Sequence, residues 1–135
     1  MPPLGEFSGV PAPATHIAIV DDDASVCRAL ARLLRASGFA VDTYVSAREF
    51  LGSLAGSTPE CLVVDLRMPE MTGLELHQHL VRGGFHIPTI LITAYGDDAT
   101  RERARNAGIG ECLEKPLQEP SLLAAINAAT GRPIS

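Results

Sequence analysis

Short apolar runs that end in a polar residue recur along this chain and alternate with longer stretches of helical period. The runs IAIV, CLVV and TILIT are apolar on both faces, which is typical of central parallel strands that helices cover on each side. We predict strands at His16–Val20, Ala40–Tyr44, Cys61–Asp65, Pro88–Thr93 and Gly110–Leu113. This alternation predicts an α/β domain.

The segments between these strands carry apolar residues at helical spacing. Val26, Leu30, Leu33 and Leu34 form an apolar stripe, and Gly38 stands where a left-handed residue would end that helix. Three further helices are predicted. The first contains Glu49, Phe50 and Leu54, and the second contains Leu76 and Leu80. The last contains Leu122 and Ile126 and has Pro120 in its first turn.

The segment Asp98–Ala107 offers only alanines as an apolar face, so we expect a weakly packed helix that is a candidate for mobility. Strict alternation with right-handed crossovers predicts a doubly wound five-stranded parallel sheet of order 2-1-3-4-5, the flavodoxin-like class. Ligands of such sheets bind outside the carboxyl ends of the strands, near the point where the strand order reverses.

The 135 residues fit one domain. Four prolines and two glycines in the first fifteen residues predict a flexible arm over 1–15, followed by a folded domain over 16–130 and a tail or linker start over 131–135. A net charge of -5 disfavours direct binding to nucleic acid or to anionic lipid.

No apolar run is long enough to cross a bilayer, and the amino terminus has no signal-peptide pattern, so we expect a cytoplasmic protein. The three cysteines, Cys27, Cys61 and Cys112, show no metal or redox spacing. We interpret them as small buried hydrophobic residues.

Polar residues stand at the carboxyl ends of four predicted strands, and they are Asp21, Asp22, Asp23, Asp65, Thr93 and Lys115. Crowded carboxylates raise one another's pKa unless a cation offsets them, and oxygen ligands without His or Cys favour Mg²⁺ or Mn²⁺. A lysine and a threonine nearby suit the oxygens of a phosphoryl group, so this edge has the parts needed for phosphoryl transfer.

Asp65 is the best candidate nucleophile, because it ends a central strand and is followed by the turn residues MPEMTG. The alternative is that Asp65 only caps a helix around Gly73. A cap would not need a matching threonine and lysine on the next two strands, so we favour the nucleophile.

The segments IVDDD, LVVDLRMPEMTG, ILITAYGD and EKP resemble the signature segments of the response-regulator receiver domain of two-component signalling. The resemblance runs from about His16 to Ala129 and is closest to the FixJ-like branch. It implies that Asp65 accepts phosphate from a sensor histidine kinase, and that Asp21 and Asp22 hold Mg²⁺ together with Asp65 and the backbone carbonyl of Arg67.

By the same resemblance, Thr93 and Lys115 grip the phosphoryl group, and the Lys115–Pro116 peptide bond is cis. Phosphorylation would change the face formed by the fourth and fifth strands and their helices. This face would then control homodimerisation or a transcriptional effector. The chain would then be either a stand-alone receiver or a fragment that precedes a C-terminal DNA-binding effector, and the FixJ-like resemblance favours the fragment. No membrane partner is expected. Asp23 matches an acidic position beside Asp21 and Asp22, and we favour a helix cap for it over a metal ligand.

Cys112 departs from the family, which usually has Tyr or Phe three residues before the lysine. A thiol cannot fill the volume of a ring, so the usual threonine–aromatic coupling is in doubt. We hypothesise a relay through the backbone after Thr93 and the Asp98–Ala107 helix. A redox switch at Cys112 is the alternative, and no resolving cysteine lies nearby in sequence.

Arg67 and Tyr95 each lie two residues after a site residue. We predict that both flank the path of the hydrolytic water and slow autodephosphorylation; the alternative is that both project into solvent.

The arginines Arg101, Arg103 and Arg105 indicate a solvated helix face, or a pairing of Arg101 and Arg105 with acids such as Glu111 or Glu119 across a dimer.

Two other classes of function fit the sequence less well than the receiver does. A phosphatase of the haloacid-dehalogenase type needs a second Asp two residues after its nucleophile, whereas Leu66 and Arg67 follow Asp65. A flavodoxin-like nucleotide-binding module needs a phosphate loop after the first strand, where DDDAS would repel phosphate.

Overall fold

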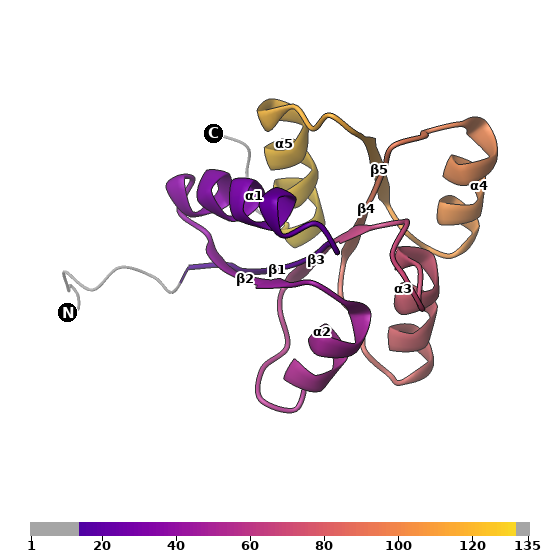
Figure 1. Cartoon of the computed structure of the whole chain (residues 1–135), viewed down its shortest axis with the longest axis horizontal. Coiled ribbons are helices and arrows are strands. Elements are labelled where there is room, and N and C mark those ends of the chain that lie inside the picture. Colours follow the sequence, from indigo (N-terminus) through magenta and orange to yellow (C-terminus); the bar gives the residue numbers. More distant parts are fainter. Residues whose placement is uncertain (1–13, 132–135) are drawn as a thin grey trace.

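The computed structural model of the chain describes residues 14–131, and the predictions for an arm over 1–15 and a tail over 131–135 fall almost wholly outside them. Strands and helices alternate through this range (Figure 1). The strands are β1 (His16–Val20), β2 (Ala40–Tyr44), β3 (Cys61–Asp65), β4 (Thr89–Thr93) and β5 (Glu111–Glu114). The helices are α1 (Ala24–Ala36), α2 (Ala47–Ser53), α3 (Gly73–Arg82), α4 (Asp98–Asn106) and α5 (Glu119–Thr130).

The strands form one parallel sheet in the order β2-β1-β3-β4-β5, which confirms the predicted flavodoxin-like topology. The bounds of two strands differ by one residue from the prediction. β4 begins at Thr89 because Pro88 has no N–H for the ladder, although its carbonyl accepts from the Leu62 amide at 2.9 Å. β5 covers Glu111–Glu114 in place of Gly110–Leu113.

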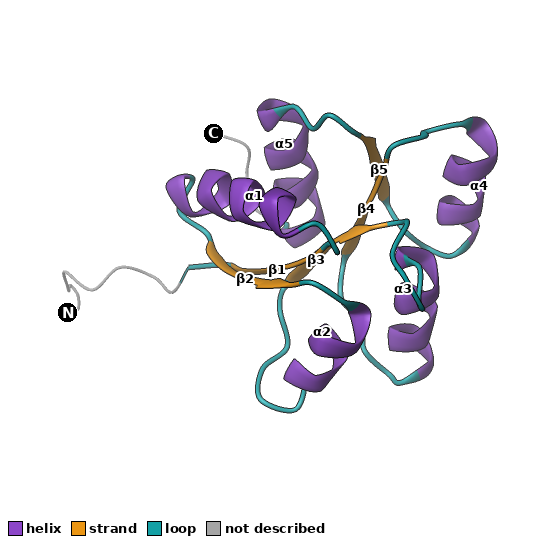
Figure 2. Cartoon of the chain, viewed as in Figure 1, coloured by secondary structure: helices purple, strands orange, loops and turns teal. Residues whose placement is uncertain are grey.

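Helices cover both faces of the sheet, with α1 and α5 on one face and α2, α3 and α4 on the other (Figure 2). Alternate residues of β3 divide between the two cores, since Val63 packs with the α1 and α5 side and Val64 with the opposite side. β3 and β4 are buried along their whole length, so the strand ends that carry polar residues are fixed in position.

Local sequence signals set the helix ends. The Asp23 side chain caps α1 by accepting from the Ser25 and Val26 amides, which confirms the predicted cap. Gly38, just beyond α1, has a φ of +94°, the left-handed conformation predicted there. Leu54 is the residue that follows α2, one position outside the helix in which it was expected.

Helix α4 has the weak apolar face that its sequence predicts, because Ala104 is its only buried residue. Polar contacts hold it in addition. The Nε2 of His77 lies 3.0 Å from the Ala107 carbonyl at the end of α4, and since a carbonyl only accepts, the imidazole N–H donates. Nothing in the described part of the chain is a helix of the length and apolarity that crossing a membrane requires.

We predict opposite effects of two glycine substitutions on stability. A Cβ on Gly73 would lie 2.5 Å from the carbonyl oxygen of Asp65 and 2.9 Å from Leu91 Cδ1, so Gly73→Ala should lower the free energy of unfolding by about 1–3 kcal/mol. A Cβ on Gly52 meets no atom within 4 Å, so Gly52→Ala should raise it by about 0.4–1 kcal/mol. Urea unfolding measures both, and equal effects would contradict the close packing at Gly73.

Candidate functional site

Three carboxylates meet at the carboxyl edge of the sheet. Asp21 and Asp22 follow β1, Asp65 ends β3, and oxygens of all three lie within 4.8 Å of one another. Asp21 is 1% exposed and Asp65 is 7% exposed, while Asp22 is open to solvent. Backbone pairing fixes Asp21, whose amide donates to the Tyr44 carbonyl at 3.0 Å.

Lys115 brings a positive charge to these carboxylates. Its Nζ lies 3.3 Å from Asp21 Oδ2 and 3.6 Å from Asp65 Oδ1. The lysine follows β5, where its amide donates to the Thr93 carbonyl at 2.8 Å, and the Lys115–Pro116 peptide bond is cis as expected. The structure therefore brings together the aspartates and the lysine that the strand ends predicted.

The charges at this edge are unbalanced. Burial raises the pKa of Asp65, the negative charge of Asp21 raises it further, and Lys115 only partly opposes them. Burial alone would lower the pKa of Lys115, but the carboxylates of Asp21 and Asp65 outweigh it and raise that pKa. Three acids against one ammonium group fit a divalent cation with oxygen ligands, so the donor set could hold a metal ion.

Thr93 is buried at the end of β4, beside the strand that ends in Asp65. Its hydroxyl donates to the Tyr95 carbonyl at 3.2 Å and accepts from the Tyr95 amide at 3.1 Å. The threonine thus holds the loop that leads from β4 to α4. Its hydroxyl can donate to a new oxygen at this edge only by leaving the Tyr95 carbonyl, since it has one proton.

Arg67 and Tyr95 lie together at the rim. The Cζ atom of Arg67 is 5.8 Å from the centre of the Tyr95 ring, a cation–π distance, and Tyr95 is 67% exposed. Both residues are open to solvent, as the alternative to a role in hydrolysis supposes, yet they contact each other. This contact joins the loop after β3 to the loop after β4.

Cys112 is half-buried on β5 and packs against the core on the α3 and α4 side. Burial raises the pKa of its thiol, and no disulfide forms, because all three cysteines are free. Cys27 and Cys61 are buried as predicted. Burial raises the pKa of Cys61 to about 12, which agrees with an inert thiol.

Arg101 corrects the prediction of a solvated arginine face on α4. Its Nε donates to the Gly96 carbonyl at 3.1 Å and its Nη1 to the Cys112 carbonyl at 3.0 Å, whereas Arg103 and Arg105 are exposed. These two bonds use two of the five N–H donors of Arg101, so a pairing with acids across a dimer would be made by the remaining donors. The sequence carried no signal for them, because helical spacing does not tell which carbonyls lie within reach.

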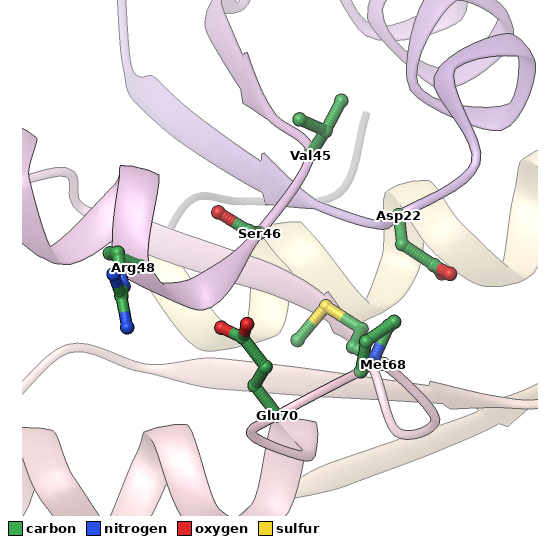
Figure 3. Close-up of a pocket in the computed structure, with 7 residues that line it drawn as sticks. Asp22, Val45, Ser46, Arg48, Met68 and Glu70 are labelled. Carbon is green, nitrogen blue, oxygen red and sulfur yellow. The ribbon is translucent and has the colours of Figure 1, made fainter.

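A pocket beside Asp22 was also missed. It lies between the loops after β2 and β3, and its lining is Asp22, Val45, Ser46, Arg48, Met68, Pro69 and Glu70. Figure 3 shows Asp22 and Arg48 on opposite sides of it. Glu70 has a φ of +72°, a conformation that is uncommon outside glycine and that nothing in the sequence marked.

Known proteins resemble this chain over most of its length. The sequence profile of the response regulator receiver domain matches residues 17–127. Response regulator protein TodT of Pseudomonas putida is 41% identical over 116 residues, which are 86% of this chain and 51% of TodT. Transcriptional regulatory protein FixJ of Rhizobium meliloti is 39% identical over 112 residues, which are 83% of this chain and 55% of that protein.

The fold gives the same result. A crystal structure of FixJ-N superposes with a TM-score of 0.81 at 35% identity, covering 92% of this chain and 99% of that one. The chain spans about half the length of the curated relatives that it matches. Its profile match, its sequence relatives and its sheet order agree, and the chain therefore belongs to the response regulator receiver domain family of two-component signalling.

Proposed function

We propose that Asp65 is the phosphoacceptor of this receiver domain and takes its phosphoryl group from a phosphohistidine of a sensor histidine kinase. The observation that carries the proposal is the ammonium group of Lys115, 3.6 Å from the Asp65 carboxylate, at an edge that also holds Asp21 and Asp22. The positive charge of Lys115 beside Asp65 suits the binding of phosphoryl oxygens at this edge.

The transfer forms one bond and breaks one. A carboxylate oxygen of Asp65 attacks phosphorus, the P–N bond of the phosphohistidine breaks, and its electron pair stays on the ring nitrogen, which takes a proton from solvent. Lys115 attracts the phosphoryl oxygens during the transfer. Later a water attacks phosphorus, the P–O bond to Asp65 breaks, the carboxylate is restored, and the proton of the water goes to solvent.

Mg²⁺ is the proposed cofactor, with Mn²⁺ as a substitute, held by Asp21, Asp22, Asp65 and the backbone carbonyl of Arg67. When bound, it supplies the positive charge that lets the carboxylates and a phosphoryl group share one edge. The protein contributes the fixed positions of the carboxylates, because two of the three are buried at strand ends.

The output is proposed to be transcriptional. The relatives include proteins named as transcriptional regulators, and this chain corresponds to about half of their length. We infer that phosphorylation of Asp65 changes the face formed by β4, α4 and β5, and that this face controls homodimerisation or an effector domain. DNA would be bound only through such an effector domain. A cytoplasmic location stays a prediction from the sequence.

Phosphorylation of Asp65 can be tested directly by incubation with acetyl phosphate and Mg²⁺. We expect a mass gain of one phosphoryl group that hydroxylamine removes, because an acyl phosphate is labile to that nucleophile. The gain should vanish in Asp65→Asn and persist in Asp98→Asn, a change of an exposed acid on α4. A hydroxylamine-stable gain, or a gain retained in Asp65→Asn, would contradict the assignment.

Magnesium should stabilise the fold through Asp22. At about 100 times its Kd, a ligand that binds only the folded state adds about 2.7 kcal/mol to the free energy of unfolding. Asp22 is exposed, so Asp22→Asn should fold normally but lose most of the increase in Tm that MgCl₂ produces. Thermal unfolding with Asp98→Asn as the control measures this, and an unchanged increase in Asp22→Asn would exclude its carboxylate as a ligand.

Arg67 and Tyr95 should slow hydrolysis of the acyl phosphate by covering the approach of water. A surface cation–π contact contributes about 0.5–1 kcal/mol, so Arg67→Ala and Tyr95→Ala should each shorten the lifetime of the phosphate by about two- to fivefold. Decay of the phosphorylated mass measures this lifetime. Unchanged lifetimes in both variants would mean that the pair leaves the path of the water open.

A further inference from the structure

Arg101 connects three segments that lie beside the site. It belongs to the first turns of α4, and it donates to Gly96 in the loop after β4 and to Cys112 on β5. The side chain is half-buried. A guanidinium group can bind two carbonyls at once because its donors form a rigid planar fork.

These bonds matter because α4 has little else to hold its N-terminal end. Ala104 is the only buried residue of the helix, and the His77 contact is made at its C-terminal end, to Ala107. The amino-terminal turns of α4 therefore depend on Arg101 for their attachment to β5. An element held by few polar contacts can change position more readily than one held by an apolar face.

Gly96 shows how closely the guanidinium group approaches the loop. A Cβ on this residue would lie 2.8 Å from Arg101 Nη2 and 3.1 Å from Glu114 Oε1. Both atoms are ends of flexible side chains, so an alanine at this position would displace them more easily than it would distort the backbone. Gly96 thus provides the space in which the guanidinium group lies.

The loop that Arg101 grips is the same loop that Thr93 holds. The Thr93 hydroxyl is bonded to the backbone of Tyr95, and the carbonyl that Arg101 binds belongs to the next residue, Gly96. A movement of the hydroxyl away from the Tyr95 carbonyl would remove one of the two bonds that hold the loop, one residue before the carbonyl that Arg101 binds.

We propose that Arg101 is a latch, a side chain that links the loop after β4 to β5 and transmits the state of Asp65 between them. The proposal rests on the proposed function of Asp65. When Thr93 turns to a phosphoryl oxygen, the Gly96 carbonyl shifts, and the guanidinium group carries the shift to the Cys112 carbonyl and to α4. Cys112 itself is a passive part of this relay, since its backbone and not its thiol accepts the bond.

The first test measures the latch without phosphorylation. In Arg101→Ala, amide hydrogens of α4 should exchange about tenfold faster, the equivalent of about 1.4 kcal/mol, while those of β1 and β3 stay unchanged. Arg101→Lys should behave in the same way, because an ammonium group keeps the charge but lacks the fork. Arg105→Ala, an exposed arginine on the same helix, is the control for charge and should exchange as the wild type does.

Gly96→Ala provides an independent route to the same state. Gly96→Ala should make the amides of α4 exchange faster, as Arg101→Ala does. The double variant should exchange no faster than Arg101→Ala alone, because both substitutions remove the same interaction, that of the guanidinium group with the loop. Additive effects, or normal exchange in α4 of Arg101→Ala, would show that the guanidinium group does not hold the helix.

The second test follows the signal. Amide chemical shifts of residues 111–114 are compared before and after treatment with acetyl phosphate and Mg²⁺, and the mass gain is measured on the same samples. We expect full phosphorylation of the wild type and of Arg101→Ala, with the shift changes in β5 reduced at least twofold in the variant. Equal shift changes in two phosphorylated proteins would overturn the latch and leave the function of Asp65 intact. A wild type that gains no phosphate would overturn both.

Discussion

Three carboxylates share the carboxyl edge of the sheet with the Lys115 ammonium group because parallel strands all end on the same side. Nearby positive charge stabilises this crowding, and Lys115 alone leaves the edge acidic. The burial of Asp21 and Asp65 prevents the carboxylates from relieving their repulsion by turning into solvent. The chemistry that we propose for the domain follows from this constraint, since an edge short of positive charge would attract a cation, and that cation would in turn allow a phosphoryl group to bind.

The central strands of the sheet are more deeply buried than the elements that follow β4. β3 and β4 are buried on both faces and keep Asp65 and Thr93 in place. Helix α4 buries only Ala104, and polar contacts of Arg101 link it to the loop after β4 and to β5. We therefore expect a chemical change at Asp65 to shift the loop after β4 and α4 more readily than β3 and β4. Membership of the receiver family also favours this switch over the phosphatase and nucleotide-binding alternatives.

The sequence was informative wherever a pattern repeats along one element. Apolar runs predicted the bounds of β1 and β3, and the aspartates at the ends of these runs predicted which carboxylates meet. Contacts between elements left no such trace. Nothing in the spacing of the α4 arginines distinguishes Arg101, which turns inward, from Arg105, which does not. Likewise, the burial of His77 depends on Thr89 and Ala107, which are distant in sequence.

The most direct test of the acidic edge is a crystal structure of the chain with Mg²⁺ and beryllofluoride, a stable mimic of the phosphoryl group. The account predicts beryllium bonded to a carboxylate oxygen of Asp65, with Lys115 and Thr93 on its fluorines and the metal against Asp21 and Asp22. It further predicts that the Thr93 hydroxyl has left the Tyr95 carbonyl. An empty edge, a mimic bound to another carboxylate, or aspartates turned apart from one another would contradict the account.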